Sequence, residues 1–232
     1  MREAGREVHH CLRSSVLFNV NVDVAQLPAR IRAALYGSSP RRDTSQALFA
    51  GAPPEYSTRI RQFAPANPLR AAVLIPIVDD GTQAGILLTQ RAEDLKTHGG
   101  QISFPGGRCE PDSEEPQETA LRESEEEIGL PRRLVDVIGY LPDHLVISGY
   151  QVTPVVALIR PGFQPVPDPL EVADVFSLPL EFLFDPANHR TRTRKFPDGD
   201  IEIYDLTYGT RSVWGATAGM LMTLYRVVVE GS

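Results

Sequence analysis

The chain has few cysteines, no excess of positive charge and no long apolar run. Its two cysteines, Cys11 and Cys109, stand far apart and lack the spacing of metal ligands. This argues against a disulfide framework and favours free thiols in a reducing compartment. The formal net charge of −7 argues against a general binder of nucleic acid or of anionic membranes, because both require a positive field.

The apolar runs are also too short to cross a membrane. The longest, such as AAVLIPIV from Ala71, cover about eight residues, whereas a spanning helix needs roughly twenty. The first twenty residues contain basic side chains but no sustained apolar core before a small-residue cleavage site, so they do not resemble a secretory signal. We therefore expect a globular, cytoplasmic protein that does not bind membranes.

The 232 residues divide by composition near Pro68. Residues 1–67 are predicted to contain a leader without a clear period, one short helix, and a connector rich in Pro, Gly, Ser and charge. The helix is indicated by apolar residues at helical spacing from Leu27, and it ends at Gly37. Residues 68–232 are predicted to form the main domain.

The main domain alternates strand-like and helix-like segments. Four apolar runs rich in β-branched residues have strand length, and we expect them to pair into one sheet. They are AAVLIPIV from Ala71, GILLTQR from Gly85, YQVTPVVALIR from Tyr150 and IEIYDLTY from Ile201. Helical patterns interrupt them at Pro116–Ile128, briefly from Leu178, and from Val213 to Val229. Strands between helices indicate an α/β layered domain.

One segment is strongly acidic, with nine carboxylates between Glu110 and Glu127. A run of like charges is usually disordered or solvated, but this one has the signals of a bounded helix. Ser113 is a candidate cap, Pro116 suits a first turn, and Gly129 suits the left-handed position that ends a helix. Small or apolar residues at three- and four-residue steps can face a core, namely Ala120, Leu121, Ser124 and Ile128.

Three carboxylates share one side of this predicted helix, because Glu126 and Glu127 follow Glu123 at i+3 and i+4. Such neighbours destabilise a helix unless a cation neutralises them. Carboxylate oxygens are ligands for Mg²⁺ or Mn²⁺, and a site with few protein ligands leaves positions for water and substrate phosphate. The alternative is a solvated helix face with no ligand.

The run RESEEEIG, from Arg122 to Gly129, resembles the second half of the Nudix box, REUXEEXGU. Only Ser124 departs from it, because the pattern has a bulky apolar residue there. The general box places five residues between its glycine and its first glutamate, whereas six separate Gly107 from Glu114. A loop longer by one residue resembles the coenzyme A pyrophosphatase branch of the Nudix hydrolases.

The members of that branch carry an acidic residue in this loop, and Asp112 or Glu114 fills its place. The upstream segment LLTQRAEDLKTHGGQISFPGG, Leu87 to Gly107, resembles the signature of the same branch. That signature has Leu-Thr-x-Arg, a His, Gly-Gln and a Phe-Pro-Gly-Gly turn. The resemblance covers roughly Pro68 to Tyr225 and implies a Nudix-type α/β/α sandwich, with a mixed β-sheet between helices.

The resemblance also implies roles for particular residues. Glu123 and Glu127 would hold the divalent metal, and Glu126 would add a ligand or take the proton from the attacking water. Spacing permits each role and does not divide them, so Glu126 and Glu127 are the catalytic candidates. Gly107, which has no Cβ, would let its carbonyl approach the same metal. Arg122 would pair with an acidic residue such as Glu114 to hold the loop.

Further candidates lie outside the box. Arg91 is the substrate-binding candidate, and Lys96 and His98 are near it in the upstream motif, although charged residues after a strand are often only solvated. His98, like Gln101, also suits a hydrogen-bonded turn before two glycines. Glu171 stands where the family has an acidic residue, as a base, a ligand or a surface residue. Trp214 is expected to pack in a core or an oligomer contact.

The implied function is metal-dependent hydrolysis of the pyrophosphate bond of coenzyme A or its acyl derivatives. The products are adenosine 3′,5′-bisphosphate and 4′-phosphopantetheine or its acyl form. A homodimer is common in the wider family. Alternatives are a Nudix enzyme for ADP-ribose, dinucleotides or nucleoside triphosphates, and a non-catalytic Nudix-fold binding protein. A calcium module of the EF-hand type is disfavoured, because no Asp-x-Asp-x-Asp-Gly loop occurs.

Overall fold

A computed structural model describes residues 23–41, 43–49, 51–56, 66–79, 81–95, 98–110, 114–196 and 199–231. The predicted leader before residue 23, with Cys11, lies outside these residues. So do three other residues named above: Lys96, Asp112 and Ser113. Among the described residues, no helix is both long and apolar enough to cross a membrane.

Nine strands of the described chain form the main sheet, which is mixed. Their bounds are β1 (Leu48–Phe49), β2 (Leu69–Asp79), β3 (Ala84–Arg91), β4 (Ile102–Ser103), β5 (Gly106–Arg108), β6 (Val135–Tyr140), β7 (His144–Val146), β8 (Tyr150–Ile159) and β9 (Val172–Pro179). Strand β2 lies at the centre, parallel to β8 on one side and antiparallel to β3 and β5 on the other. Strand β9 continues the sheet beyond β3.

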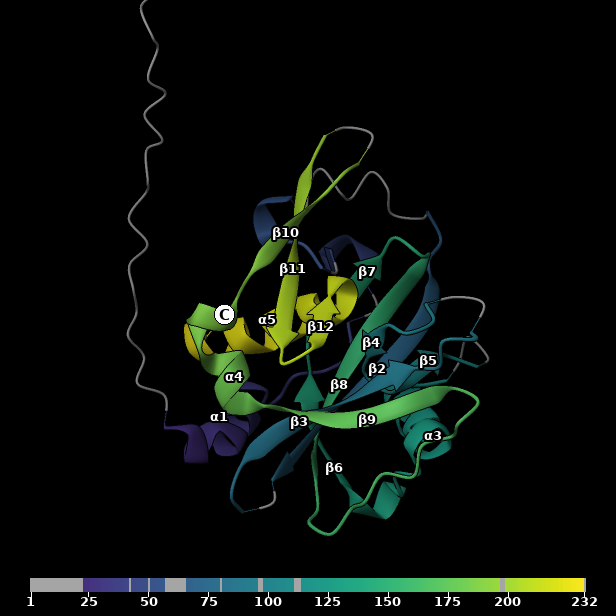
Figure 1. Cartoon of the computed structure of the whole chain (residues 1–232), viewed down its shortest axis with the longest axis vertical. Coiled ribbons are helices and arrows are strands. Elements are labelled where there is room, and N and C mark those ends of the chain that lie inside the picture. The colour runs from purple at the N-terminus through teal and green to yellow at the C-terminus, as the bar shows by residue number, and fades with distance from the viewer. Residues whose placement is uncertain are drawn as a thin grey trace, which may run out of the picture.

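The helices cover both faces of this sheet. Their bounds are α1 (Leu27–Ala34), α3 (Pro116–Ile128), α4 (Leu180–Phe184) and α5 (Gly215–Glu230). Figure 1 shows α3 on one side of the sheet and α1, α4 and α5 on the other. Side chains of β2 alternate accordingly: Ile75 and Ile77 join the core under α1 and α5, and Ala72 and Leu74 join the core under α3. The fold is the expected α/β/α sandwich with a mixed sheet.

Three of the four predicted strand runs lie in this sheet, but the fourth does not. Ile201–Tyr208 forms β11, which pairs with β10 (Thr191–Arg194) and β12 (Arg211–Trp214) in a separate three-stranded sheet. The expectation of one sheet is therefore wrong for this run. Its neighbours along the chain supply its hydrogen-bond partners, and its apolar side chains pack on the edge of the main sheet and on α5.

The C-terminal helix begins two residues later than predicted. Val213 and Trp214 belong to β12, and α5 starts at Gly215, whose φ of 61° turns the chain from strand to helix. Only glycine adopts this backbone conformation readily. Trp214 is half-buried against the apolar cluster around Phe49, with the guanidinium of Arg192 4.4 Å from its ring centre. It packs as expected.

Residues before the predicted domain boundary pack on the same cores. Leu27 and Ile31 of α1 are fully buried in the cluster that contains α5, as their spacing predicts. Strand β1, from the segment expected to be a connector, pairs in parallel with β7. The boundary at residue 68 stays a prediction. A shallow depression of about 630 Å³, lined by α1 and Leu158, lies on the face of the sheet opposite α3.

Candidate active site

The acidic helix α3 has the predicted bounds, Pro116–Ile128. Gly129 ends it with φ 65°, and the N–H of Leu130 donates to the carbonyl of Ser124 at 3.2 Å, which is the expected C-terminal turn. The N-cap position belongs to Glu115, so the prediction that Ser113 caps the helix is wrong. Proline at the first helical position fixes the start, because it needs no hydrogen-bond acceptor for an N–H.

The inner face of α3 packs on the sheet through the residues predicted for it. Ala120, Ser124 and Ile128 are fully buried, and the Ser124 hydroxyl donates to the carbonyl of Ala120 at 2.6 Å. A small residue therefore fits where the family pattern has a bulky one. Glu127 lies on this face too, and only 3% of its side chain is exposed. A carboxylate buried beside an apolar core requires compensation.

That compensation comes from the strand ends opposite the helix. The N–H of Gly106 donates to Glu127 Oε2 at 3.3 Å, and Arg91 Nη1 lies 3.6 Å from Glu127 Oε1. The pKa of Glu127 is nevertheless raised to about 7, mainly by burial and in smaller part by the charges of Glu123 and Glu171, while Arg91 and the Gly106 N–H oppose the shift.

The glycine turn before the helix has the close approach expected of it. A Cβ on Gly107 would lie 2.4 Å from the carboxylate carbon of Glu123. Gly106 has φ 154°, and a Cβ there would lie 2.4 Å from the carbonyl oxygen of Ala72. The Glu123 carboxylate thus rests directly on the backbone of Gly107, in space that any other side chain would fill.

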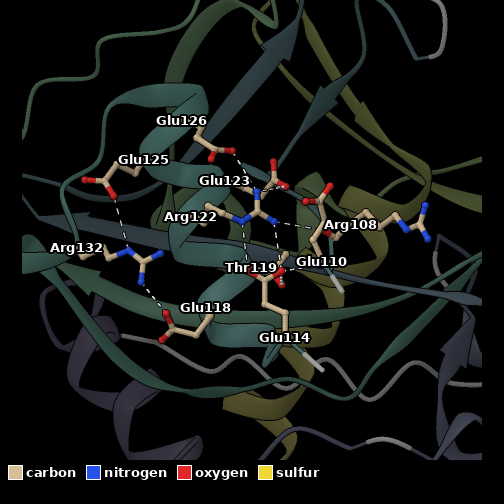
Figure 2. A network of polar contacts seen from close by, with 10 residues as sticks. All are labelled: Arg108, Glu110, Glu114, Glu118, Thr119, Arg122, Glu123, Glu125, Glu126 and Arg132. Atoms are coloured by element: carbon tan, nitrogen blue, oxygen red, sulfur yellow. Dashed lines mark hydrogen bonds and ion pairs between the residues drawn. The ribbon is translucent and has the colours of Figure 1, made fainter. Parts of the chain in front are cut away.

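Arg122 connects this turn with the outer glutamates, as Figure 2 shows. It pairs with both oxygens of Glu114, Nε to Oε1 at 3.2 Å and Nη2 to Oε2 at 3.3 Å, so the predicted loop-holding pair is present. Its Nη1 donates to Glu123 Oε1 at 2.9 Å and to Glu126 Oε2 at 3.1 Å. Arg122 thereby links two glutamates of the helix to each other and to Glu114 of the preceding loop.

Glu114 is strongly held in its charged form. Burial alone would raise its pKa, but hydrogen bonds from Arg122, from the N–H of Glu110 and from the Thr119 hydroxyl bring that pKa down to about 2. The extra residue in this loop is thus accommodated without loss of the Arg122 pair. Whether Glu114 or Asp112 is the acidic loop residue of the family stays a prediction.

A second arginine holds the opposite, outward part of the helix. Arg132, just after α3, pairs with Glu118 at 2.6 Å and Glu125 at 3.7 Å, and all three side chains are about half exposed. Pairs of this kind contribute little to stability, because water screens them. For Glu118 and Glu125, the alternative of a solvent-exposed helix face is therefore the correct one.

Glu123, Glu126 and Glu127 do not yet converge on one point. No group of three or more His, Cys, Asp or Glu side chains that could hold a metal occurs among the described residues, and Arg122 binds two of the three glutamates. Their chemistry nevertheless fits a hard divalent cation. Carboxylate oxygens are its preferred ligands, and Glu123 lies against the Gly107 backbone, whose carbonyl could add another. The ligand set of Glu123, Glu126, Glu127 and Gly107 stays a prediction.

A family model described as a NUDIX domain matches residues 68–198, which is more than half of the chain. The chain therefore belongs to the Nudix hydrolase family. This confirms the family that the two motifs indicated, and with it the enzyme class, a hydrolase acting on pyrophosphates.

Curated Nudix relatives match over most of this length. "Nudix hydrolase 15, mitochondrial" of Arabidopsis thaliana is 40% identical over 172 residues, covering 71% of this chain and 60% of the relative. "Uncharacterized Nudix hydrolase NudL" of Pectobacterium atrosepticum is 41% identical over 162 residues, covering 67% of this chain and 80% of the relative. A solved MutT/nudix family protein from Enterococcus faecalis has a TM-score of 0.47 at 17% identity, over 76% of this chain and 69% of that one.

The upstream Nudix segment is folded against the buried glutamate. Arg91 reaches Glu127, and its backbone is held by hydrogen bonds with Gly100 and Gln101. His98 has a φ of 61°, and its Nδ1 lies 2.9 Å from Gln101 Oε1. The turn-forming role weighed for His98 is therefore the one that the structure supports. Contact of Arg91 with substrate stays a prediction.

The loop before β9 closes the C-terminal end of the Nudix helix, which sequence reasoning missed. The N–H of Asp168 donates to the carbonyl of Glu127 at 2.9 Å, and that of Val166 donates to the carbonyl of Ile128 at 3.0 Å. The carbonyl of Glu171 accepts from Ala92 at 2.9 Å, and its charge acts on Glu123 and Glu127. The Pro-rich run PVPDPLE gave no sign of this contact.

Proposed function

We propose that the protein hydrolyses the pyrophosphate bond of coenzyme A or its acyl derivatives, with Mg²⁺ or Mn²⁺. One observation carries the hydrolytic part: a buried glutamate, Glu127, and a second, Glu123, meet at the Gly106–Gly107 turn. The substrate part rests on the resemblance of two segments to the coenzyme A pyrophosphatase branch. These are the upstream motif and the loop from Gly107 to Glu114.

Glu123, Glu126, Glu127 and the carbonyl of Gly107 are the groups that would hold the ion. When bound, Mg²⁺ or Mn²⁺ neutralises charge on phosphoryl oxygens and lowers the pKa of a coordinated water. The carboxylates suit this task because they offer several oxygen ligands on one helix, next to Gly107, which has no side chain of its own.

Glu127 or Glu126 accepts the proton of the attacking water. The water oxygen forms a bond to one phosphorus, and the bond from that phosphorus to the bridging oxygen breaks. Both products leave as phosphate monoesters, and no covalent enzyme intermediate is needed. Glu126 is 59% exposed and reaches the site only from its outer edge.

Arg91, which contacts Glu127, is also our candidate for binding the substrate. About a quarter of its side chain is exposed, and its Nη1 lies 3.6 Å from the Glu127 carboxylate. A substrate with two or more phosphates adds negative charge to a site that already has an excess of it. A guanidinium is a side chain that pairs well with phosphate oxygens, because it can donate two parallel hydrogen bonds. We therefore assign Arg91 to a substrate phosphate.

The assembly and the location are part of the same proposal. A homodimer is expected from the wider family, and a reducing, cytoplasmic compartment is expected from the cysteine content. Cys109 is a buried free thiol, which supports the second expectation. The Arabidopsis relative carries the word mitochondrial in its name.

A substrate panel tests this proposal. Purified protein with Mg²⁺ or Mn²⁺ is offered coenzyme A, acetyl-coenzyme A, ADP-ribose, a dinucleoside polyphosphate and a nucleoside triphosphate at equal concentrations, and products are separated by chromatography. We expect the largest kcat/KM for coenzyme A or its acyl form. A larger kcat/KM for ADP-ribose, a dinucleotide or a triphosphate would replace the substrate assignment and leave the hydrolytic site in place.

A further inference from the structure

Every N–H of the Arg122 guanidinium has its own acceptor. Nε and one Nη2 hydrogen bind the two oxygens of Glu114, and the second Nη2 hydrogen binds the carbonyl of Arg108 at 3.3 Å. We name this the anchored edge. The two Nη1 hydrogens bind Glu123 and Glu126, and we name this the Nη1 edge. Figure 2 shows the contacts of both edges.

The two edges differ in what their partners do. Glu114 and the Arg108 carbonyl belong to the loop before α3, and neither is expected to bind the metal. Glu123 and Glu126 are both expected metal ligands. Since Glu114 alone balances the single charge of Arg122, the Nη1 edge cannot neutralise two further carboxylates. It lowers their mutual repulsion and fixes their spacing.

We propose that the Nη1 edge of Arg122 is a placeholder for the divalent ion. Glu123 and Glu126 give up Arg122 when the ion binds, while the anchored edge stays on Glu114 and Arg108. This inference rests on the proposed function, because it presupposes a divalent ion at these glutamates. Arg122 is thus a positioning residue. It holds the carboxylates of Glu123 and Glu126 in position until the ion binds, and it does not take part in the reaction itself.

The exposures of the partners make this exchange feasible. Glu126 is 59% exposed, so its pair with Arg122 is screened and weak. Glu123 is 17% exposed and lies against Gly107, so it can turn to the ion with little movement of the backbone. Arg122 itself is 27% exposed, which lets water take over the Nη1 donors that are released.

The replacement of Arg122 by the ion changes metal affinity in a direction opposite to that expected if Arg122 supported the metal-bound site. If the Nη1 edge binds only in the metal-free protein, removal of Arg122 destabilises that state more than the metal-bound state. By linkage, the variant then binds metal as tightly as the parent or more tightly. If Arg122 instead supports the bound site, its removal weakens metal binding. The two accounts predict opposite signs.

The chain offers two matched controls. Arg132→Gln removes the same charge from the turn just after the helix, and its partners Glu118 and Glu125 lie on the outward side of α3. Glu114→Gln disturbs only the anchored edge. The test variant is Arg122→Gln. For all four proteins, Mn²⁺ dissociation constants are measured by calorimetry in the absence of substrate, and unfolding midpoints are measured with chelator and with saturating Mn²⁺.

We expect Arg122→Gln to unfold at a lower temperature than the parent with chelator, and this deficit to shrink with Mn²⁺. Its Mn²⁺ dissociation constant should fall by about two- to tenfold, the size expected when two screened ion pairs no longer compete. The two controls should stay within about twofold of the parent, as expected where the altered contacts are the same in both states. Weaker Mn²⁺ binding in Arg122→Gln, or an equal gain in Arg132→Gln, overturns the placeholder.

The same measurements separate this inference from the proposed function. If the parent protein binds no Mn²⁺, or if Glu123→Gln and Glu127→Gln bind it as well as the parent, the metal site itself is refuted and the placeholder with it. If the parent binds Mn²⁺ through these glutamates but Arg122→Gln binds it more weakly, only the placeholder is refuted.

Discussion

The guanidinium of Arg91, at the end of β3, lies 3.6 Å from the carboxylate of Glu127, in the last turn of α3. This is the charge contact that the structure provides for the buried glutamate, and burial still raises the pKa of Glu127 to about 7 from the ordinary 4.5. Ionisation of Glu127 therefore lowers the free energy of unfolding of the metal-free protein. Active sites commonly contain groups that lower stability in this way.

The first prediction concerns the stability of the metal-free protein against pH. Because the pKa of Glu127 is higher in the folded state, the folded protein retains a proton between pH 4.5 and about 7 that the unfolded chain releases. The contribution of Glu127 to stability is complete below pH 4.5 and is lost as pH rises through about 7. The loss should amount to roughly 2–4 kcal/mol.

Urea unfolding of the parent and of Glu127→Gln, with chelator at pH 5 and pH 8, measures this loss. The parent should lose more stability than the variant between the two values. Glu126→Gln, at an exposed position on the same helix, should follow the parent. Equal losses in the parent and in Glu127→Gln would show that Glu127 titrates normally.

The second prediction concerns Gly107. In Gly107→Ala the new methyl group would take the place of the Glu123 carboxylate, because the two would lie 2.4 Å apart. Displacement of one ligand should weaken Mn²⁺ binding by about 10- to 100-fold, as changes next to a metal site commonly do. Calorimetry measures it. Gly81→Ala, at a loop glycine with no atom within 4 Å of the added Cβ, is the control and should bind Mn²⁺ as the parent does.

An unchanged dissociation constant in Gly107→Ala, with the fold intact by circular dichroism, would mean that Glu123 has room to bind the metal elsewhere. That result would remove the Gly107 backbone from the predicted ligand set. A loss of metal binding in Gly81→Ala of the same size would instead point to a general effect of glycine substitution.

The third prediction concerns the residues before the predicted boundary at 68. Ile31 of α1 is fully buried in the core shared with α5, so Ile31→Ala should lower the free energy of unfolding by about 2–5 kcal/mol. Tyr36→Ala, in the same segment but 91% exposed, should change it by about 0.5 kcal/mol or less. Urea unfolding measures both. No loss in Ile31→Ala would show that the segment is dispensable for the fold.

The elements that could be predicted from the sequence are those with local signals. Pro116 and Gly129 mark the ends of α3 because each has backbone preferences that act within a few residues. The apolar face of the helix follows from its own spacing, and its residues are buried as expected. The glutamate trio follows from the same helical spacing, and the Arg122–Glu114 pair was expected from the resemblance to the Nudix box.

Contacts between distant segments could not be predicted in the same way. Ile201–Tyr208 has the alternation of a strand, but alternation does not name a partner strand, so its place in a separate sheet was missed. Likewise, no local sequence signal predicts that Arg91 contacts Glu127, or that the N–H of Asp168 donates to the last turn of α3. These contacts depend on which strands and loops the fold brings together.

The central claim is that the Glu123–Glu127 face of α3 hydrolyses coenzyme A with a divalent ion. The most direct measurement is the release of adenosine 3′,5′-bisphosphate from coenzyme A by the purified protein with Mg²⁺, compared with chelator and with Glu127→Gln. We expect release by the parent, none with chelator, and a rate about 10²- to 10⁴-fold lower in folded Glu127→Gln. Full activity in Glu127→Gln, or no release from coenzyme A and its acyl derivatives by the parent, would contradict the account.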